Sequence, residues 1–367
     1  MFKIICFFVL IFAFFACSHR NKDIDYLNGN MVSFSKDSVR TQKMKSYAIG
    51  VANCGYGMFS VYDSLLIFWN PNIPDHFFCI YSVDTEKELG FFCNKGRGHN
   101  EFFSIGPINQ LFQTEDDLKT VVCDYNAKKI YNWNISQSIL KHNTVFDTIV
   151  SYKHLENIMN SMVNDLFYLS ENVYLAKMNS LYFEESEKLL SYYQKWEMAD
   201  NKIGDLSLYK GVVVGNEKEY EQLRGRTYSV DVIKPDGTKV VQAMREVPQI
   251  NIIDIKTGQT TFYRLSDISE TSIFGKESGN NVYYNSVQAD DKYIYATYWG
   301  KKQWEVGLGS KSPCIRLIHV FDWDGNLLYE LETDRPFFRI ALDPIRNRLY
   351  TADLNTDEMY YLDLNEF

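Results

Sequence analysis

The feature that most constrains the fold is a recurring pattern of short strands joined by glycine turns. In the clearest example, residues 318–323 alternate between apolar and polar, Asp324-Gly325 follows, and a second alternating run covers 326–331. An Asp-Gly pair between two such runs predicts a tight β-hairpin, because both central residues of a type I′ turn take positive φ angles. The chain therefore predicts consecutive antiparallel strands rather than strands that alternate with helices. The same kind of turn is expected at two earlier positions, Asp236-Gly237 and Thr257-Gly258.

These strands are grouped into units of similar length. Residues 287–321 and 338–364 each contain the same succession of strands and turns. A unit takes about 40 to 50 residues for four strands, which is the size of a propeller blade. Aromatic residues make up 16% of the chain, and such side chains suit the half-buried surface of a sheet. We therefore expect an all-β fold, a single β-propeller over residues 43–367, with six four-stranded blades favoured over seven.

Two segments do not fit this pattern. Residues 184–196 place apolar side chains at helical spacing, but the end of the segment also suits a strand, so both alternatives stay open. Residues 215–226 are polar and charged, and we expect an insertion loop there.

The first 17 residues are typical of a secretory signal. Lys3 precedes an unbroken apolar run over residues 4–15, and Ala16 and Cys17 stand immediately before polar, charged sequence. The apolar run is too short to span a bilayer. These residues predict export.

The junction of the signal with the rest of the chain resembles a bacterial lipobox. Residues 14–17 are Phe-Phe-Ala-Cys, and in a lipobox the cysteine is lipidated and becomes the new N-terminus. The resemblance implies a signal peptide over 1–16, a lipidated tether over 17–42 and attachment to a membrane through the lipid on Cys17. Ser18 stands where an aspartate would imply inner-membrane retention, so we expect an outer-membrane lipoprotein. The alternative is an ordinary cleavable signal with Cys17 as a buried cysteine.

Charge and cysteine content exclude some classes of function. The formal net charge is −9 and no basic cluster occurs, which argues against a partner nucleic acid. The six histidines are scattered, so we predict no metal site and no other cofactor. No CxxC spacing occurs, and buried free thiols are favoured because most cysteines lie in apolar runs. Five cysteines remain beyond the predicted lipidation site, namely Cys54, Cys79, Cys93, Cys123 and Cys314.

A phrase in residues 91–102 resembles a family motif. It contains Gly96-Arg97-Gly98 and ends in Glu-Phe. It is similar to the Gly-Arg-Gly-Pro-(Gly/Asn)-Glu-Phe phrase of the TolB-like six-bladed propeller lipoproteins of gut anaerobes, with His99 in place of the proline. The resemblance extends more loosely to the C-terminus and implies a six-bladed propeller. It implies no activity, because the family is mostly uncharacterised.

Two roles are open to this phrase. The two glycines allow a tight loop on which Glu101 lies within reach of the Arg97 guanidinium. The favoured role is structural, with an Arg97–Glu101 pair that locks a buried turn between blades. In the alternative, Arg97 and His99 face a central channel and bind an anionic group.

Three further residues are candidates for ligand binding. Trp299 and Trp304 flank polar residues in an expected loop, a pattern that suits stacking on a sugar. Packing in the core is the favoured alternative for each, because tryptophan is highly buried on average. Arg339, which follows two phenylalanines, is expected either to line an entrance between blades or to pack.

The favoured function is a binding or scaffolding module of the cell envelope, for a glycan, a peptide or an envelope protein that approaches one mouth of the ring. No nucleophile elbow, P-loop or metal-spaced histidine pair indicates an enzyme. The first alternative is a hydrolase or lyase that acts on an exported substrate such as a carbohydrate, with residues from several blades meeting in the channel. The second is a purely structural partner with a large apolar patch. Four acids could hold calcium in the channel, although turn capping is favoured for each, namely Glu101, Asp124, Asp290 and Asp353.

Overall fold

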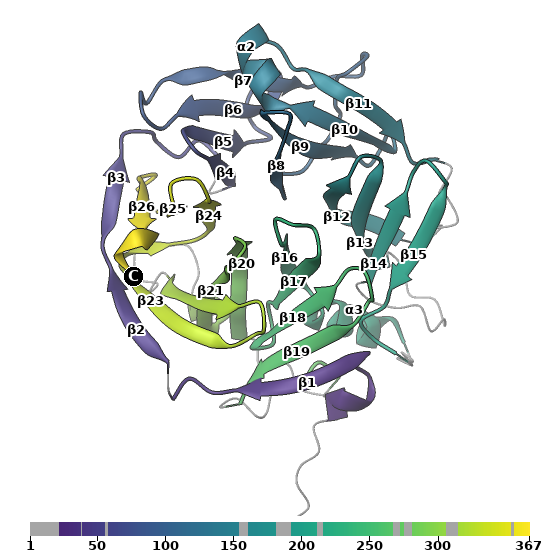
Figure 1. The fold of residues 1–367 in the computed structure, drawn as a ribbon, viewed down its shortest axis with the longest axis vertical. Helices are drawn as coiled ribbons and strands as arrows, with labels where there is room; N and C mark the ends of the chain where they lie inside the picture. Colours follow the sequence, from purple (N-terminus) through teal and green to yellow (C-terminus); the bar gives the residue numbers. More distant parts are fainter. Residues whose placement is uncertain are drawn as a thin grey trace, which may run out of the picture.

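The strands form a ring of six sheets around a central axis (Figure 1). The computed structural model describes residues 22–37, 39–55, 58–153, 161–180, 192–210, 216–266, 272–274, 281–305, 315–353 and 356–367. The fold is therefore the six-bladed β-propeller that the strand pattern predicted. The expected signal peptide and Cys17 lie outside the described residues.

Each blade is an antiparallel sheet of four strands, which follow one another from the axis outward. Blade 1 contains β4 (Phe59–Tyr62), β5 (Leu65–Trp69), β6 (His76–Ser82) and β7 (Glu88–Asn94). Blade 2 contains β8 (Leu111–Thr114), β9 (Asp117–Asp124), β10 (Lys129–Asn134) and β11 (Phe146–Ser151). Blade 3 contains β12 (Ser161–Ser170), β13 (Val173–Ser180), β14 (Tyr192–Glu197) and β15 (Lys202–Leu206). Blade 4 contains β16 (Ser229–Ile233), β17 (Lys239–Met244), β18 (Gln249–Asp254) and β19 (Thr260–Leu265). Blade 5 contains β20 (Asn281–Ala289), β21 (Tyr293–Lys302), β22 (Ile315–Asp322) and β23 (Leu327–Phe337). Blade 6 contains β24 (Ile340–Asp343), β25 (Arg348–Ala352), β26 (Met359–Asp363) and the N-terminal β3 (Ser46–Ile49).

The N-terminal segment runs along the outside of three blades. The strand β1 (Gly29–Phe34) pairs in parallel with β19, and β2 (Arg40–Met44) pairs in parallel with β23. The next strand, β3, pairs antiparallel with β26 and closes the ring. Figure 1 shows β1, β2 and β3 following one another along the outer rim. Part of the segment that the sequence assigned to a tether thus extends two sheets of the propeller.

A buried ion pair fixes the start of this segment to blade 4. Asp23, in the short 3₁₀ helix η1 (Lys22–Asp25), is fully buried. Its carboxylate lies 2.6 Å from Nη1 of Arg264 on β19. It also accepts hydrogen bonds from the backbone N–H groups of Ile273 (3.0 Å) and Phe274 (3.1 Å). The carboxylate therefore connects η1 to two other parts of the chain.

The predicted hairpins are present, although their turn type differs from the expectation. Gly325 takes a φ angle of 79°, but Asp324 is not among the described residues with positive φ. The Asp322 carboxylate instead accepts hydrogen bonds from the backbone N–H groups of Asp324 (3.0 Å) and Asn326 (2.8 Å). The loop is thus longer than a two-residue type I′ turn. Only its glycine takes a positive φ angle, as in hairpin loops where a turn is followed by one left-handed residue. A Cβ atom at Gly325 would lie 2.3 Å from the Tyr263 ring, so this position requires glycine.

The segment that was expected as an insertion loop is a helix in the structure. Helix α3 covers Glu217–Arg226, and the Asn216 side chain caps it by accepting a hydrogen bond from the Glu219 N–H (3.0 Å). Tyr220 and Leu223, three residues apart, are buried against the core of blades 3 and 4. The expectation was wrong because two apolar residues and a cap are enough for a short helix that packs on a larger core. A second short helix, α2 (Ile135–Lys141), follows β10.

The other ambiguous segment ends in a strand. Its described part belongs to β14, where Trp196 is fully buried. The remainder of residues 184–196 lies outside the described residues.

The described cysteines are free thiols, as their apolar surroundings predicted. Cys79, Cys93 and Cys123 are buried, and Cys54 is half-buried with its sulfur 3.3 Å from that of Cys79. Burial raises the pKa of the Cys123 thiol to about 12. Cys314 lies outside the described residues.

A histidine is buried inside blade 5. His319 on β22 is fully buried, and its Nε2 donates a hydrogen bond to the Glu330 carboxylate (3.2 Å). Its Nδ1 accepts one from the Tyr284 hydroxyl (3.1 Å). Lys36, between β1 and β2, also contacts Glu330 (3.1 Å). Burial lowers the pKa of His319 to about 4, whereas the hydrogen bond from His319 lowers the pKa of Glu330 to about 2.

We expect this histidine to make the fold sensitive to acid. Between pH 6.5 and about 4 the unfolded imidazole binds a proton that the buried imidazole rejects. The free energy of unfolding should therefore fall as pH decreases through this window. Urea unfolding at a series of pH values measures the slope, and His319→Gln should flatten it. The exposed His99→Gln is the matched control, and an unchanged slope in His319→Gln would contradict the assignment.

Candidate functional site

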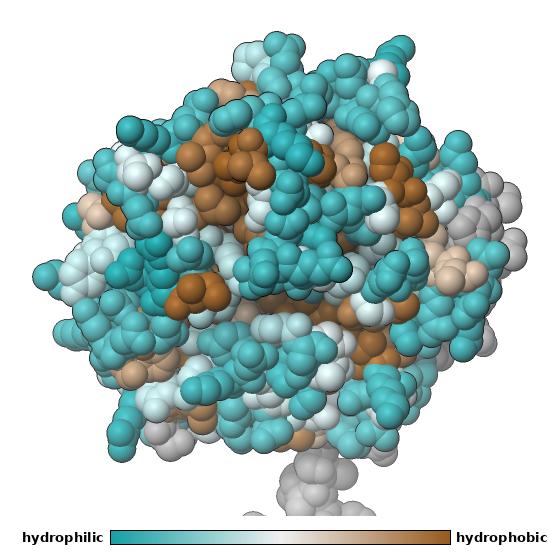
Figure 2. All heavy atoms as spheres, turned by 45° about the horizontal axis from the view of Figure 1, so that its top comes forward, coloured by the Kyte–Doolittle hydropathy of each residue, from teal (hydrophilic) through white to brown (hydrophobic). Residues whose placement is uncertain are grey.

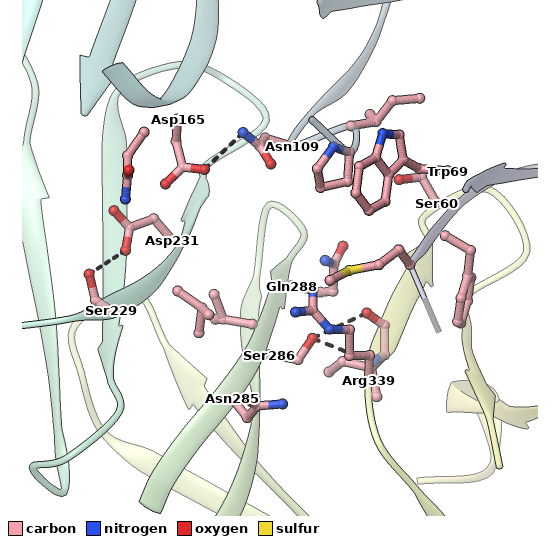
Figure 3. Close-up of a pocket in the computed structure, with 18 of the residues that line it drawn as sticks. Ser60, Trp69, Asn109, Asp165, Ser229, Asp231, Asn285, Ser286, Gln288 and Arg339 are labelled. Carbon is pink, nitrogen blue, oxygen red and sulfur yellow. Dashed lines mark hydrogen bonds between the residues drawn. The ribbon is translucent and has the colours of Figure 1, made fainter. Parts of the chain in front are cut away.

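The inner strands of all six blades surround a pocket of about 420 Å³. Five of these strands contribute residues directly, and the segment that leads into β8 contributes for blade 2. Figure 3 shows these side chains converging from several strands. The pocket therefore exists only because the ring is closed. One lining residue from each blade, in chain order, is Ser60, Asn109, Asp165, Ser229, Ser286 and Ile340.

One side of the pocket contains a buried lysine between two carboxylates. The side chains of Lys177 on β13 and Asp231 on β16 are 2% and 0% exposed, and Nζ lies 2.9 Å from the Asp231 carboxylate. The Asp165 carboxylate on β12 lies 3.7 Å from the same Nζ and accepts a hydrogen bond from the Asn109 amide (2.9 Å). Lys177 also donates to the Ser229 hydroxyl (2.9 Å). Every charge in this acidic cluster (Asp165, Lys177, Asp231) therefore has a partner of opposite sign.

Burial and charge act in opposite directions on this acidic cluster. Loss of solvent raises the pKa of Asp165, although Lys177 opposes that shift. Burial disfavours the Lys177 cation, but the two carboxylates together raise the pKa of the lysine above its usual value. Lys177 is therefore held as a cation, whereas burial favours the protonated form of Asp165 more than in an exposed carboxyl.

On the other side of the pocket, the described residues place no carboxylate against the Arg339 guanidinium. Arg339 immediately precedes β24, and its buried Nε has no hydrogen-bond partner within the part of the chain that the structure describes. Among the described residues, the charged or titratable groups that act on it are Tyr228 and Arg245. Burial lowers the pKa of Arg339 from its usual value. In Figure 3 the Arg339 side chain lies beside Gln288 and Ser286, away from Asp165.

Neutral polar groups and an indole complete the lining. The Nδ2 atom of Asn285, a residue only 8% exposed, finds no hydrogen-bond partner among the residues described. Ser60 and Gln288 also line the pocket. The Trp69 indole N–H donates to the Ile105 carbonyl (2.9 Å), which fixes the ring at the pocket wall. The arrangement can hold a small polar molecule against an apolar surface, and Asp165 could exchange a proton with it.

The acids proposed for calcium do not converge in the described structure. Within the residues described, no three His, Cys, Asp or Glu side chains come together as a metal would require. Asp124 instead accepts hydrogen bonds from the backbone of the turn after β9, at the N–H groups of Asn126 and Ala127 (both 2.9 Å). Asp290 caps the turn after β20 in the same way. Turn capping thus accounts for these two acids.

The Arg97 loop lies after β7, the outermost strand of blade 1, and Arg97 and His99 are both exposed. Neither residue lines the pocket. The expected Arg97–Glu101 pair is not formed between these described residues, because the Glu101 carboxylate accepts a hydrogen bond from the Gly98 backbone N–H (2.8 Å) instead. The Arg97 guanidinium lies 5.9 Å from the ring centre of Phe103. Both roles expected for Arg97 therefore need correction.

The loop is nevertheless held in place by its glycine and its phenylalanine. A Cβ atom at Gly96 would lie 1.9 Å from a Glu101 carboxylate oxygen, so the close approach of the carboxylate requires glycine. Phe102 is fully buried, and its ring packs on Tyr131 of blade 2 with centres 4.7 Å apart. The motif thus joins blade 1 to blade 2.

The two tryptophans that were candidates for stacking on a sugar have different environments. Trp299 on β21 is 9% exposed and lies near the Phe338 ring, whereas Trp304 is 71% exposed. Trp299 is therefore buried, as the favoured alternative of core packing expected, whereas Trp304 is not. Of the candidates predicted from sequence, Arg339 alone lines the pocket, and the residues of the acidic cluster were not predicted. One signal was present, because Lys177 interrupts an otherwise mostly apolar strand.

Comparisons with known proteins support the fold. A member of the DUF4221 family from Bacteroides vulgatus superposes with a TM-score of 0.58 and 10% sequence identity, over 89% of this chain and 97% of that one. A protein from Bacteroides fragilis, described as exported, gives a TM-score of 0.50 and 11% identity over 91% of this chain and 99% of that one. The likeness is one of fold. No family model matches the sequence, and no curated protein matches it.

The helices of the propeller are short. No helix among the described residues has the length and apolar character needed to cross a bilayer.

Proposed function

We propose that this protein is a binding module of the cell envelope and that its ligand is a small polar molecule held in the central pocket. The observation that carries the proposal is a pocket built by all six blades in which Arg339 and Asn285 keep polar atoms without partners. Buried polar groups are nearly always hydrogen-bonded in folded proteins, because an unmade hydrogen bond is costly. A ligand would supply the missing partners.

The face drawn in Figure 2 agrees better with a small ligand than with a large apolar partner. Figure 2 shows a mostly hydrophilic face on which apolar residues form separate patches. A purely structural partner in a complex would favour one large contiguous patch. A glycan or a peptide remains the proposed partner.

We further propose that the protein is a TolB-like lipoprotein anchored in the outer membrane through Cys17. The support is the apolar run over residues 4–15, the lipobox-like residues 14–17 and the phrase around Arg97. Cys17→Ala should release the protein from membranes during cell fractionation. Unchanged membrane association of this variant would contradict the lipid anchor.

A thermal-shift screen tests the binding function. The chain from residue 18 onward, which retains every described residue, is screened against envelope glycans, peptides and divalent metals. A ligand that binds the folded state raises the melting temperature by mass action. The shift should disappear in Gln288→Trp, which fills the pocket, and persist in Trp304→Gln, an exposed change outside it. Absence of any shift, or a shift that Gln288→Trp leaves intact, would contradict the proposal.

A hydrolase or lyase is the second candidate, favoured by one observation. Asp165 lines the pocket and burial raises its pKa, which is the environment of a general acid. Such an enzyme would convert the screened glycan, and Asp165→Asn would abolish turnover while binding persisted. Binding without turnover in the wild type would favour the binding module.

A further inference from the structure

The two charged sides of the pocket differ in how well their charges are compensated. In the acidic cluster, Lys177 contacts both Asp231 and Asp165, and Asn109 donates to Asp165. Because Lys177 is an ionic partner of both carboxylates, this side needs no additional cation. A ligand would meet hydrogen-bonding groups here rather than a bare negative charge.

Arg339 has the opposite surroundings. The residue is half-buried, its Nε atom is buried and has no partner among the described residues, and a second cation, Arg245, acts on it. A buried charge is costly unless it is paired. An arginine offers two parallel N–H donors in one plane, which match the two oxygens of a carboxylate. The group that best completes this side is therefore one carboxylate.

The remaining lining indicates the body of the ligand. Ser60, Asn285 and Gln288 contribute neutral hydroxyl and amide groups, which both donate and accept hydrogen bonds. The fixed Trp69 ring supplies an apolar face. A ring that carries several hydroxyl groups on its edge and C–H groups on its faces uses both features. The volume of about 420 Å³ lies within the range of small-molecule sites.

From these observations we propose that the pocket binds a hydroxyl-rich ring bearing one carboxylate, the chemistry of a uronic acid, and that Arg339 binds the carboxylate. The inference rests on the proposed binding function and specifies its ligand class. The ring lies against Trp69, and its hydroxyl groups reach the amides and the Asp165–Asn109 pair. The carboxylate removes the energetic penalty of the unpaired guanidinium.

The test compares acidic and neutral sugars of the same ring. Glucuronate, galacturonate and mannuronate are titrated into the chain from residue 18, beside glucose, galactose, mannose and the zwitterion glycylglycine. Calorimetry and melting temperature are the readouts. At least one uronate should bind more tightly than its neutral counterpart, and Arg339→Gln should weaken that uronate about tenfold or more, as loss of a charged hydrogen-bonded pair does. Arg316→Gln, which removes the same charge from an exposed position, should bind like the wild type.

The outcomes separate this inference from the broader proposal. Equal affinity for a uronate and its neutral counterpart would overturn the role of the carboxylate. Glycylglycine binding without uronate binding would overturn the sugar class, and both results would leave the binding function standing. Binding of none of these probes, together with no shift in the wider screen, would overturn both proposals.

A second variant keeps the test valid if Arg339→Gln fails to fold. Arg339→Lys keeps the charge without the paired donors and should still weaken binding of the uronate. Unchanged affinity in this variant would contradict the bidentate contact.

Discussion

Asp23→Ala is expected to lower the free energy of unfolding by about 3 to 5 kcal/mol, the usual cost of removing one partner of a buried ion pair. The substitution leaves the Arg264 guanidinium buried without its carboxylate and removes the acceptor of the Ile273 and Phe274 N–H groups. The 3₁₀ helix η1 and β1 should then detach from blade 4 more easily. Chemical denaturation and hydrogen exchange of residues 29–34 measure the two effects.

The neighbouring Asp25 provides the control for this prediction. It belongs to the same short helix but is exposed, so Asp25→Ala should change the free energy of unfolding by about 0.5 kcal/mol or less. Similar stabilities of the two variants would show that the Asp23–Arg264 pair does not hold the segment.

Lys177→Met is expected to cost a similar amount, about 3 to 5 kcal/mol at neutral pH. The variant leaves the Asp231 carboxylate, which is fully buried, without its cation and removes the partner of Asp165. The pKa of Asp165, already raised by burial, would rise further. Because the folded state would then bind a proton more readily than the unfolded state, the loss of stability should shrink as pH falls.

A lysine on the adjacent strand gives the matched control. Lys195 on β14 is 38% exposed and contacts Glu197, so Lys195→Met should have little effect at any pH. Denaturation curves at pH 7 and pH 5 compare the two variants. A pH-independent loss in Lys177→Met would mean that packing, rather than the unpaired carboxyls, causes the destabilisation.

Local sequence signals predicted the blades but not the strands outside them. The glycine turns at Gly237, Gly258 and Gly325 predicted three hairpins. In the structure each of these glycines takes a φ angle between 70° and 79°. The strands β1 and β2 were not predicted because only one residue of the two, Met44, is fully buried. Backbone pairing with β19 and β23 holds them, and such pairing leaves little trace in hydrophobic patterning.

The pocket could be predicted only in part for a similar reason. Asp165, Lys177 and Asp231 each look like an isolated polar residue in a strand, and their proximity follows from the packing of blade 3 against blade 4. Arg339 was predicted because it follows two phenylalanines, which says nothing about whether its charge has a partner. The Arg97 phrase was informative about family and loop geometry, yet its conspicuous arginine is exposed. The residues that stand out in the sequence are thus mostly not the residues that line the pocket.

The outer strands also determine the order in which the molecule can assemble. Gly29 pairs with Thr260, Arg40 with Tyr329, and Ile49 with Met359, so each of the first strands to be synthesised waits for a partner made more than 200 residues later. Closing such long loops is slow, because the entropy of the intervening chain is lost before the contacts form. Until blade 6 exists, β3 has nothing to pair with. A nascent chain of this design stays open at its leading end, and ring closure becomes the final event after translation.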